Sequence, residues 1–196
     1  MTRFKIENHW LETARRMSSE NCDDRPVDTA VSLIVIHCIS LPPGVFGGDG
    51  IDRLFQNRLI PEQHPYFESI HQLKVSAHVL IRRTGEITQY VPFDRRAWHA
   101  GQSSYDGRSN CNDYSIGIEL EGADDSPFTN PQYLRLGALI VSLIDHYPAL
   151  SRNRITGHSD IAPGRKTDPG RYFDWERLFG LINGNALSDI QDRGLL

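Results

Sequence analysis

Residues 31–36 read Val-Ser-Leu-Ile-Val-Ile, a stretch that is apolar at five of six positions and rich in β-branched side chains. A strand with one solvated face alternates between apolar and polar residues, whereas a strand buried on both faces is continuously apolar. The stretch therefore predicts a central strand that is covered on both sides. His37 follows it directly, and the Pro- and Gly-rich segment 41–48 predicts a long loop beyond.

A second strand is predicted at 114–120, where the residues alternate cleanly. One face carries the large apolar side chains of Tyr114, Ile116, Ile118 and Leu120. The other face carries Ser115, Gly117 and Glu119. Small neighbours predict a cavity above this face, with the Glu119 carboxylate at its floor.

Shorter patterns predict elements before and between these strands. Apolar residues at helical spacing indicate a short helix within 10–17, and a second helix can begin at 51–55. Two β-rich stretches, 75–82 and 87–91, flank a short turn and predict a hairpin.

Two helices are predicted near the C-terminus. Asn130 followed by Pro131 is a cap with a first-turn proline, and apolar residues then recur at spacings of three and four over 133–147. Asp174 caps a final helix. A short strand at 154–157 and a loop at 158–172 lie between them. Because strands and helices do not alternate strictly, we expect an α+β fold with a mixed central β-sheet flanked by helices.

Length and composition limit the class of protein. The chain has 196 residues, of which 39% are hydrophobic, so one domain over 1–183 with a flexible tail over 184–196 is expected. A formal net charge of −4 argues against a general nucleic-acid binder. The apolar stretches are too short to span a membrane, and the N-terminus lacks a secretory pattern. Three scattered cysteines predict no disulfide framework, so a reducing cytoplasm fits best.

His37 and His158 each follow a predicted strand, and Asp168 lies ten residues beyond His158. Two imidazoles and a carboxylate that leave room for a water are typical of a catalytic zinc site. The alternative is that both histidines are held by backbone hydrogen bonds.

Glu119 and Lys166 are the candidate catalytic side chains. A carboxylate can take a proton from an attacking water and pass it to a leaving amine, and a lysine can stabilise an oxyanion. The alternatives are a strand glutamate in a salt bridge and a solvated loop lysine.

Three further side chains could belong to a site. His78 and His99 can be metal ligands, substrate contacts or structural residues. Cys38 is next to His37, and neighbours in an extended strand point to opposite faces, so the two should not bind one metal.

Five motifs occur in order: VIHCISLPPG at 35–44, VSAHVLI at 75–81, RAWHAG at 96–101, CNDYSIGIELEG at 111–122 and GHSDIAPGRKTDPG at 157–170. Together they resemble the AmpD-type N-acetylmuramoyl-L-alanine amidases, the cytoplasmic zinc amidases of bacterial cell-wall recycling. The resemblance implies the fold of peptidoglycan recognition proteins and type 2 amidases. It also implies hydrolysis of the amide between the lactyl group of 1,6-anhydro-N-acetylmuramic acid and L-alanine.

The resemblance also implies residue roles. One zinc ion per chain would be held by His37, His158 and Asp168, with Glu119 as general base and then general acid and Lys166 at the oxyanion. The predicted substrate contacts are Cys38, Lys74, His78, Arg82, Trp98, His99, Arg108 and Arg165. Cys38 departs from the asparagine usual in the family. The substrate is a soluble anhydro-muropeptide, and we expect no nucleic-acid, membrane or obligatory protein partner.

Two other functions use the same fold. A muropeptide-binding module that does not cleave would lack metal ligands, whereas all of the ligand candidates are present here. An exported amidase acting on intact peptidoglycan would need a signal that the sequence does not show.

Overall fold

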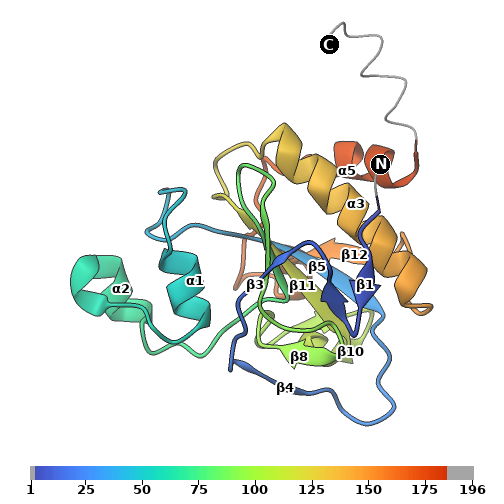
Figure 1. Cartoon of the computed structure of the whole chain (residues 1–196), viewed down its shortest axis with the longest axis horizontal. Coiled ribbons are helices and arrows are strands. Elements are labelled where there is room, and N and C mark those ends of the chain that lie inside the picture. The colour runs from blue at the N-terminus through green and yellow to red at the C-terminus, as the bar shows by residue number, and fades with distance from the viewer. Residues whose placement is uncertain (1–2, 185–196) are drawn as a thin grey trace, which may run out of the picture.

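A six-stranded mixed sheet forms the centre of the protein, in a computed structural model that describes residues 3–184 (Figure 1). The strand order is β12 (Ile155–Gly157), β5 (Leu33–Ile39), β11 (Ser115–Glu121), β6 (Val79–Ile81), β7 (Ile87–Gln89) and β3 (Arg15–Arg16). β5 runs parallel to both β12 and β11, and β11 is also parallel to β6. β6 and β7 are antiparallel, as the hairpin prediction required. The α+β class with a mixed sheet is confirmed.

Alternate residues of the two longest strands face opposite layers. Ile34 and Ile36 of β5, with Ile118 of β11, lie in the main core cluster. This layer is covered by α3 (Asn130–His146) and α5 (Trp175–Ile182), which pack on each other (Figure 1). The intervening residues face a smaller layer on the other side of the sheet. The prediction of a strand that is buried on both faces is therefore confirmed, and β5 extends through His37 to Ile39.

The remaining elements are short. They are β1 (Ile6–Glu7), β2 (Trp10–Leu11), β4 (Cys22–Asp24), α1 (Gly50–Phe55), η1 (Pro61–Gln63), α2 (Pro65–Ile70), β8 (Arg95–Ala97), β9 (Ser104–Tyr105), β10 (Arg108–Ser109), η2 (Cys111–Asp113) and α4 (His158–Ile161). α1 and α2 lie together at one side of the sheet (Figure 1). None of the helices in residues 3–184 is long and apolar enough to cross a membrane.

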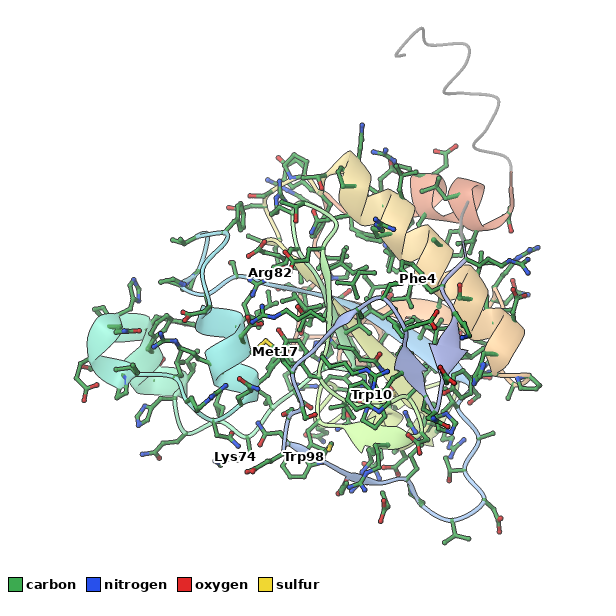
Figure 2. All side chains as sticks on the ribbon, viewed as in Figure 1. Phe4, Trp10, Met17, Lys74, Arg82 and Trp98 are labelled. Carbon is green, nitrogen blue, oxygen red and sulfur yellow. The ribbon has the colours of Figure 1, made fainter. Side chains whose placement is uncertain are left out.

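The helix predicted within 10–17 is wrong, because this segment pairs with the sheet instead. The Leu11 amide donates to Gln89 Oε1 at 2.7 Å, and the Met17 amide donates to the Gln89 carbonyl at 3.0 Å. The segment therefore runs alongside the sheet as β2 and β3, and Trp10 and Met17 lie well apart on it (Figure 2). Tertiary hydrogen bonds override the local apolar spacing here.

Three smaller predictions need correction. Thr129 caps α3, rather than Asn130, since Thr129 Oγ1 accepts from the Gln132 amide and Gln132 Oε1 accepts from the Thr129 amide. Tyr114 precedes β11 with ψ 8°, so it packs in the smaller layer and not beside Ile116. The predicted loop at 158–172 begins with the short helix α4. The cap predicted at Asp174 is confirmed.

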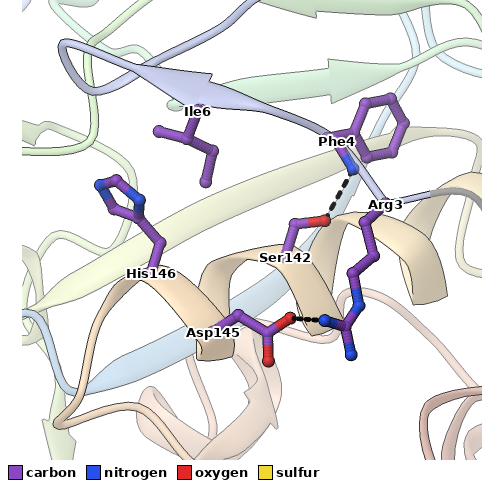
Figure 3. A pocket seen from close by; sticks show the side chains of 6 residues that line it. All are labelled: Arg3, Phe4, Ile6, Ser142, Asp145 and His146. Atoms are coloured by element: carbon purple, nitrogen blue, oxygen red, sulfur yellow. Dashed lines mark hydrogen bonds and ion pairs between the residues drawn. The ribbon is translucent and has the colours of Figure 1, made fainter.

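The N-terminal segment packs against the outer side of α3 around a small hollow (Figure 3). The Phe4 amide donates to Ser142 Oγ at 2.8 Å, and Arg3 forms an ion pair with Asp145 at 2.8 Å. The predicted tail, apart from Gly184, lies outside the described residues.

Two leucines of α3 test which side of the helix is buried. Leu136 is 0% exposed and Leu134 is 42% exposed. Leu136→Ala should lower the free energy of unfolding by about 2–5 kcal/mol, because it leaves a cavity above the sheet. Leu134→Ala should change it by less than about 0.5 kcal/mol. Denaturant unfolding followed by circular dichroism measures both, and equal losses would contradict this packing.

Candidate metal centre and active site

Three neighbouring parallel strands bring the candidate residues together at their carboxyl-terminal ends. His37 of β5 is directly opposite Glu119 of β11 in the parallel register. β12 flanks β5 on the other side, and His158 follows β12 directly as the first residue of α4. The carboxyl ends of parallel strands commonly form the binding crevice of a sheet. The fold therefore gathers side chains that are more than a hundred residues apart in sequence.

His37, His158 and Asp168 present three lone-pair atoms to one point. The two Nδ1 atoms are 2.9 Å apart, and Asp168 Oδ2 lies 3.1 Å from each of them. Ligand atoms bound tetrahedrally to zinc at their usual bond lengths lie about 3.3 Å apart. This donor set, one oxygen and two nitrogens, therefore fits a single small divalent cation such as zinc, and it leaves a fourth position for water or substrate.

The charge states of this cluster also suit a cation. Burial lowers the pKa of His37 to about 4, so its imidazole is neutral at pH 7. Burial alone would raise the pKa of Asp168, but its contacts with His158 and His37 outweigh burial and hold that pKa well below its usual value. A metal ion needs neutral imidazoles and ionised carboxylates, and these are the forms favoured for His37 and Asp168.

The outer nitrogens of both histidines meet the segment 98–101. His158 Nε2 lies 3.2 Å from the Ala100 carbonyl, which can only accept, so the ring donates from Nε2, and in its neutral form Nδ1 is left as a lone pair. His37 Nε2 lies 2.9 Å from His99 Nδ1. Such outer partners orient metal-binding imidazoles and select their tautomer.

The cavity predicted above Ser115 and Gly117 is filled by the His99 ring, so this expectation is wrong. A Cβ atom on Gly117 would lie 2.4 Å from His99 Cγ. The small residues of β11 therefore make room for an imidazole of the protein. His99 thus lies beside His37 and behind the metal cluster.

Glu119 is a buried carboxylate whose Oε2 has no hydrogen-bond partner within residues 3–184. Burial raises its pKa well above the usual value, and the nearby Asp168 carboxylate raises it further, whereas the charge of Lys166 lowers it. No ion pair to Glu119 forms among the described side chains, which disfavours the salt-bridge alternative. Its Oε2 is therefore a buried acceptor that no described group of the protein uses.

Lys166 lies in the exposed loop between His158 and Asp168. Burial is the main influence on the pKa values of His37, which it lowers, and Glu119, which it raises. The positive charge of Lys166 lowers both pKa values. The ammonium charge of Lys166 therefore reaches His37 and Glu119 electrostatically.

Two of the predicted substrate contacts are engaged within the protein interior. Cys38 points to the opposite face from His37, packs against the main core, and donates to Asp124 Oδ1 at 3.2 Å. Burial raises the pKa of its thiol. His78 is fully buried, where its Nδ1 accepts from the Gly117 amide at 3.0 Å. This geometry favours structural roles for both residues.

Arg82, another predicted substrate contact, forms ion pairs inside the protein. Its guanidinium pairs with Asp52 at 3.1 Å and with Glu121 at 2.9 Å, and both carboxylates are buried. Glu121 Oε1 also accepts from the Gly47 amide at 2.8 Å, which ties the Pro-Gly loop to the sheet. The arginine therefore neutralises buried acids and is not free to bind a stem peptide.

The other predicted contacts lie nearer the surface. Trp98 Nε1 donates to Asp23 Oδ1 at 3.1 Å, and Arg165 donates to the carbonyls of Ala100 and Gln102 at 2.6 Å. Arg108 lies over the Tyr114 ring at 4.0 Å. Lys74 is exposed.

Sequence reasoning missed Asn112. Its Oδ1 accepts from the amides of His99 at 3.1 Å and Ala100 at 2.8 Å, so it fixes the segment that contacts both metal-facing histidines. No local pattern marks an asparagine for this task, because its partners lie in a separate loop.

Comparison with known proteins gives a consistent set of relatives. A family model described as N-acetylmuramoyl-L-alanine amidase matches residues 27–171. The 1,6-anhydro-N-acetylmuramyl-L-alanine amidase AmpD of Enterobacter cloacae is 55% identical over 94% of this chain and 98% of its own. A crystal structure of a selenomethionine AmpD derivative superposes with a TM-score of 0.89 at 57% identity, covering 91% of this chain and 99% of that one.

A more distant structure contains a ligand. It is a complex of the N-acetylmuramyl-L-alanine amidase AmiD from E. coli with the substrate anhydro-N-acetylmuramic acid-L-Ala-D-gamma-Glu-L-Lys. Its TM-score is 0.59 at 27% identity, and the match covers 80% of this chain and 60% of that one.

The buried arginine provides a test of its structural role. Arg82→Met should lower the free energy of unfolding by about 3–5 kcal/mol, because Asp52 and Glu121 lose their buried partner. Arg108→Met, at an exposed position where only the stacking on Tyr114 is lost, should change it by about 1 kcal/mol or less. Thermal and denaturant unfolding measure both variants. An Arg82→Met protein as stable as Arg108→Met would show that the ion pairs are unimportant.

Proposed function

The chain belongs to the N-acetylmuramoyl-L-alanine amidase family, and from that premise we propose that it is a zinc-dependent 1,6-anhydro-N-acetylmuramyl-L-alanine amidase of cell-wall recycling. The substrate is a soluble anhydro-muropeptide, and the bond hydrolysed joins the lactyl group to L-alanine. The observation that carries the proposal is the convergence of His37, His158 and Asp168 beside the unpartnered carboxylate of Glu119. The printed names of the relatives support the substrate class.

His37, His158 and Asp168 would hold one zinc ion per chain. Zinc at this position would polarise the scissile carbonyl and lower the pKa of a water molecule. The two histidines come from the sheet edge and α4, whereas Asp168 comes from the loop that follows α4. The Ser159 amide donates to the Asp168 carbonyl at 2.9 Å, which folds that loop back toward His158.

Glu119 would move the proton. Its Oε2 accepts a proton from the attacking water, and the resulting oxygen nucleophile forms the new bond to the lactyl carbon. Glu119 then gives the proton to the alanine nitrogen as the carbon–nitrogen bond breaks, so the peptide leaves as a neutral amine. Burial and the Asp168 charge favour the protonated carboxyl that delivers the proton to the nitrogen, whereas the charge of Lys166 favours the carboxylate that first accepts it.

Lys166 would stabilise the negative charge that develops on the carbonyl oxygen. Lys74, Trp98, Arg108 and Arg165 lie nearer the surface and remain proposed substrate contacts, as does His99, which is partly exposed beside His37. A cytoplasmic location is part of the proposal, because a soluble recycling intermediate is the substrate. The non-cleaving alternative is disfavoured by the complete set of candidate ligands together with Glu119.

Metal removal tests the cofactor. Mass spectrometry of the purified protein with soluble 1,6-anhydro-muropeptide should show release of free peptide and anhydro-sugar. A chelator should abolish the release, and added zinc should restore it, because the carbonyl and the water both depend on the cation. Undiminished release by protein shown to be free of metal would contradict the proposal.

The proton-transfer role is tested at one carboxyl. Glu119→Gln should lower kcat by about 10²–10⁴-fold while zinc content stays at one per chain, because the amide cannot accept the proton. Glu176→Gln, at an exposed position of α5, is the matched control and should keep full activity. Steady-state kinetics and metal analysis check both. A Glu119→Gln protein with wild-type kcat would remove Glu119 from the mechanism.

A further inference from the structure

Four groups behind the metal cluster form a continuous line of hydrogen-bonding contacts. Ser115 Oγ lies 2.5 Å from the Cys111 carbonyl oxygen, and His99 Nε2 lies 3.1 Å from Ser115 Oγ. His99 Nδ1 then lies 2.9 Å from His37 Nε2. The line ends at His37 Nδ1, which faces Asp168 and His158.

The first contact sets the direction of all the others. A backbone carbonyl can only accept, so the proton between Cys111 and Ser115 belongs to the serine hydroxyl. Ser115 Oγ must then accept from His99 Nε2, which leaves His99 Nδ1 as a lone pair in the neutral ring. That lone pair accepts from His37 Nε2, and the Nδ1 of His37 is left without a proton.

We propose that Ser115 and His99 are positioning residues that hold His37 in the only neutral tautomer able to bind the metal. The inference rests on the proposed function, since it assigns the supporting groups of that same site. The opposite tautomer would place a proton on His37 Nδ1, between it and the Asp168 carboxylate 3.1 Å away. The carboxylate attracts that proton, so His37 needs an opposing acceptor, and His99 Nδ1 provides it.

The surroundings of His99 fix its ring in this line. Its backbone amide donates to Asn112 Oδ1 at 3.1 Å, and its ring fills the space above Gly117, where a Cβ atom would clash. The next residue, Ala100, presents its carbonyl to His158 Nε2 at 3.2 Å. Two consecutive residues therefore support both metal-facing imidazoles, one through a side chain and one through the backbone.

Three variants test whether the line of hydrogen bonds, and not packing alone, sets the tautomer of His37. Ser115→Ala removes the hydroxyl that sets the direction of the hydrogen bonds. His99→Phe keeps a ring above Gly117 but removes both ring nitrogens. His99→Gln keeps one acceptor and one donor and serves as the conservative rescue. Ser142→Ala is the matched control, because Ser142, labelled in Figure 3, is also a buried serine. Its hydroxyl likewise donates to a carbonyl four residues earlier, that of Ala138, at 2.9 Å.

The readouts are zinc affinity, by competition with a chromogenic chelator, and histidine tautomers, by long-range ¹H–¹⁵N NMR of the full chain. Ser115→Ala and His99→Phe should bind zinc about 10–100-fold more weakly, whereas His99→Gln and Ser142→Ala should stay near the wild-type affinity. In the wild-type protein without metal, His37 and His99 should both carry the proton on Nε2. In Ser115→Ala, the His99 tautomer should no longer be uniform.

Zinc affinity in Ser115→Ala equal to that in Ser142→Ala, with unchanged tautomers, would overturn the inference. A wild-type His37 protonated on Nδ1 would also overturn it. Neither readout uses the substrate. Failure of the proposed amidase function would therefore show separately, as a zinc-loaded protein that releases no peptide.

Discussion

The parallel pairing of β5 with β11 is the constraint on which the rest of the structure depends. Its register sets His37 opposite Glu119 and turns both residues to the face away from α3. A slip of one residue would exchange the two faces, moving the imidazole into the apolar core and an isoleucine into the site. The same large apolar side chains that stabilise the sheet against α3 therefore fix the register that sets His37 opposite Glu119.

The second consequence of this pairing is the layer behind the site. Gly117 leaves enough room on β11 for the ring of His99, and Ser115 on the same face meets that ring. Asn112 ties down the backbone of the segment that carries His99. The metal-facing residues are thus supported by a second layer of side chains, which the small residues on one face of β11 make room for.

Sequence patterns predicted the elements that are long enough to show their own periodicity. The two central strands and the helices covering them were found because their apolar residues repeat over many positions. The segment 10–17 was misjudged, since its backbone is held by Gln89 and not by its own turns. The five ordered motifs identified the candidate metal and catalytic residues. Spacing along a chain could not show that Arg82 forms ion pairs with buried carboxylates or that the His99 ring fills the expected cavity.

X-ray absorption spectroscopy of the zinc-loaded protein tests the central claim most directly. The account predicts one zinc per chain, surrounded by two imidazoles and by oxygen ligands at about 2.0–2.2 Å. It also predicts no sulfur ligand, because Cys38 points to the opposite side of β5 from His37. A sulfur shell at about 2.3 Å, or a zinc ion with fewer than two imidazoles, would contradict it.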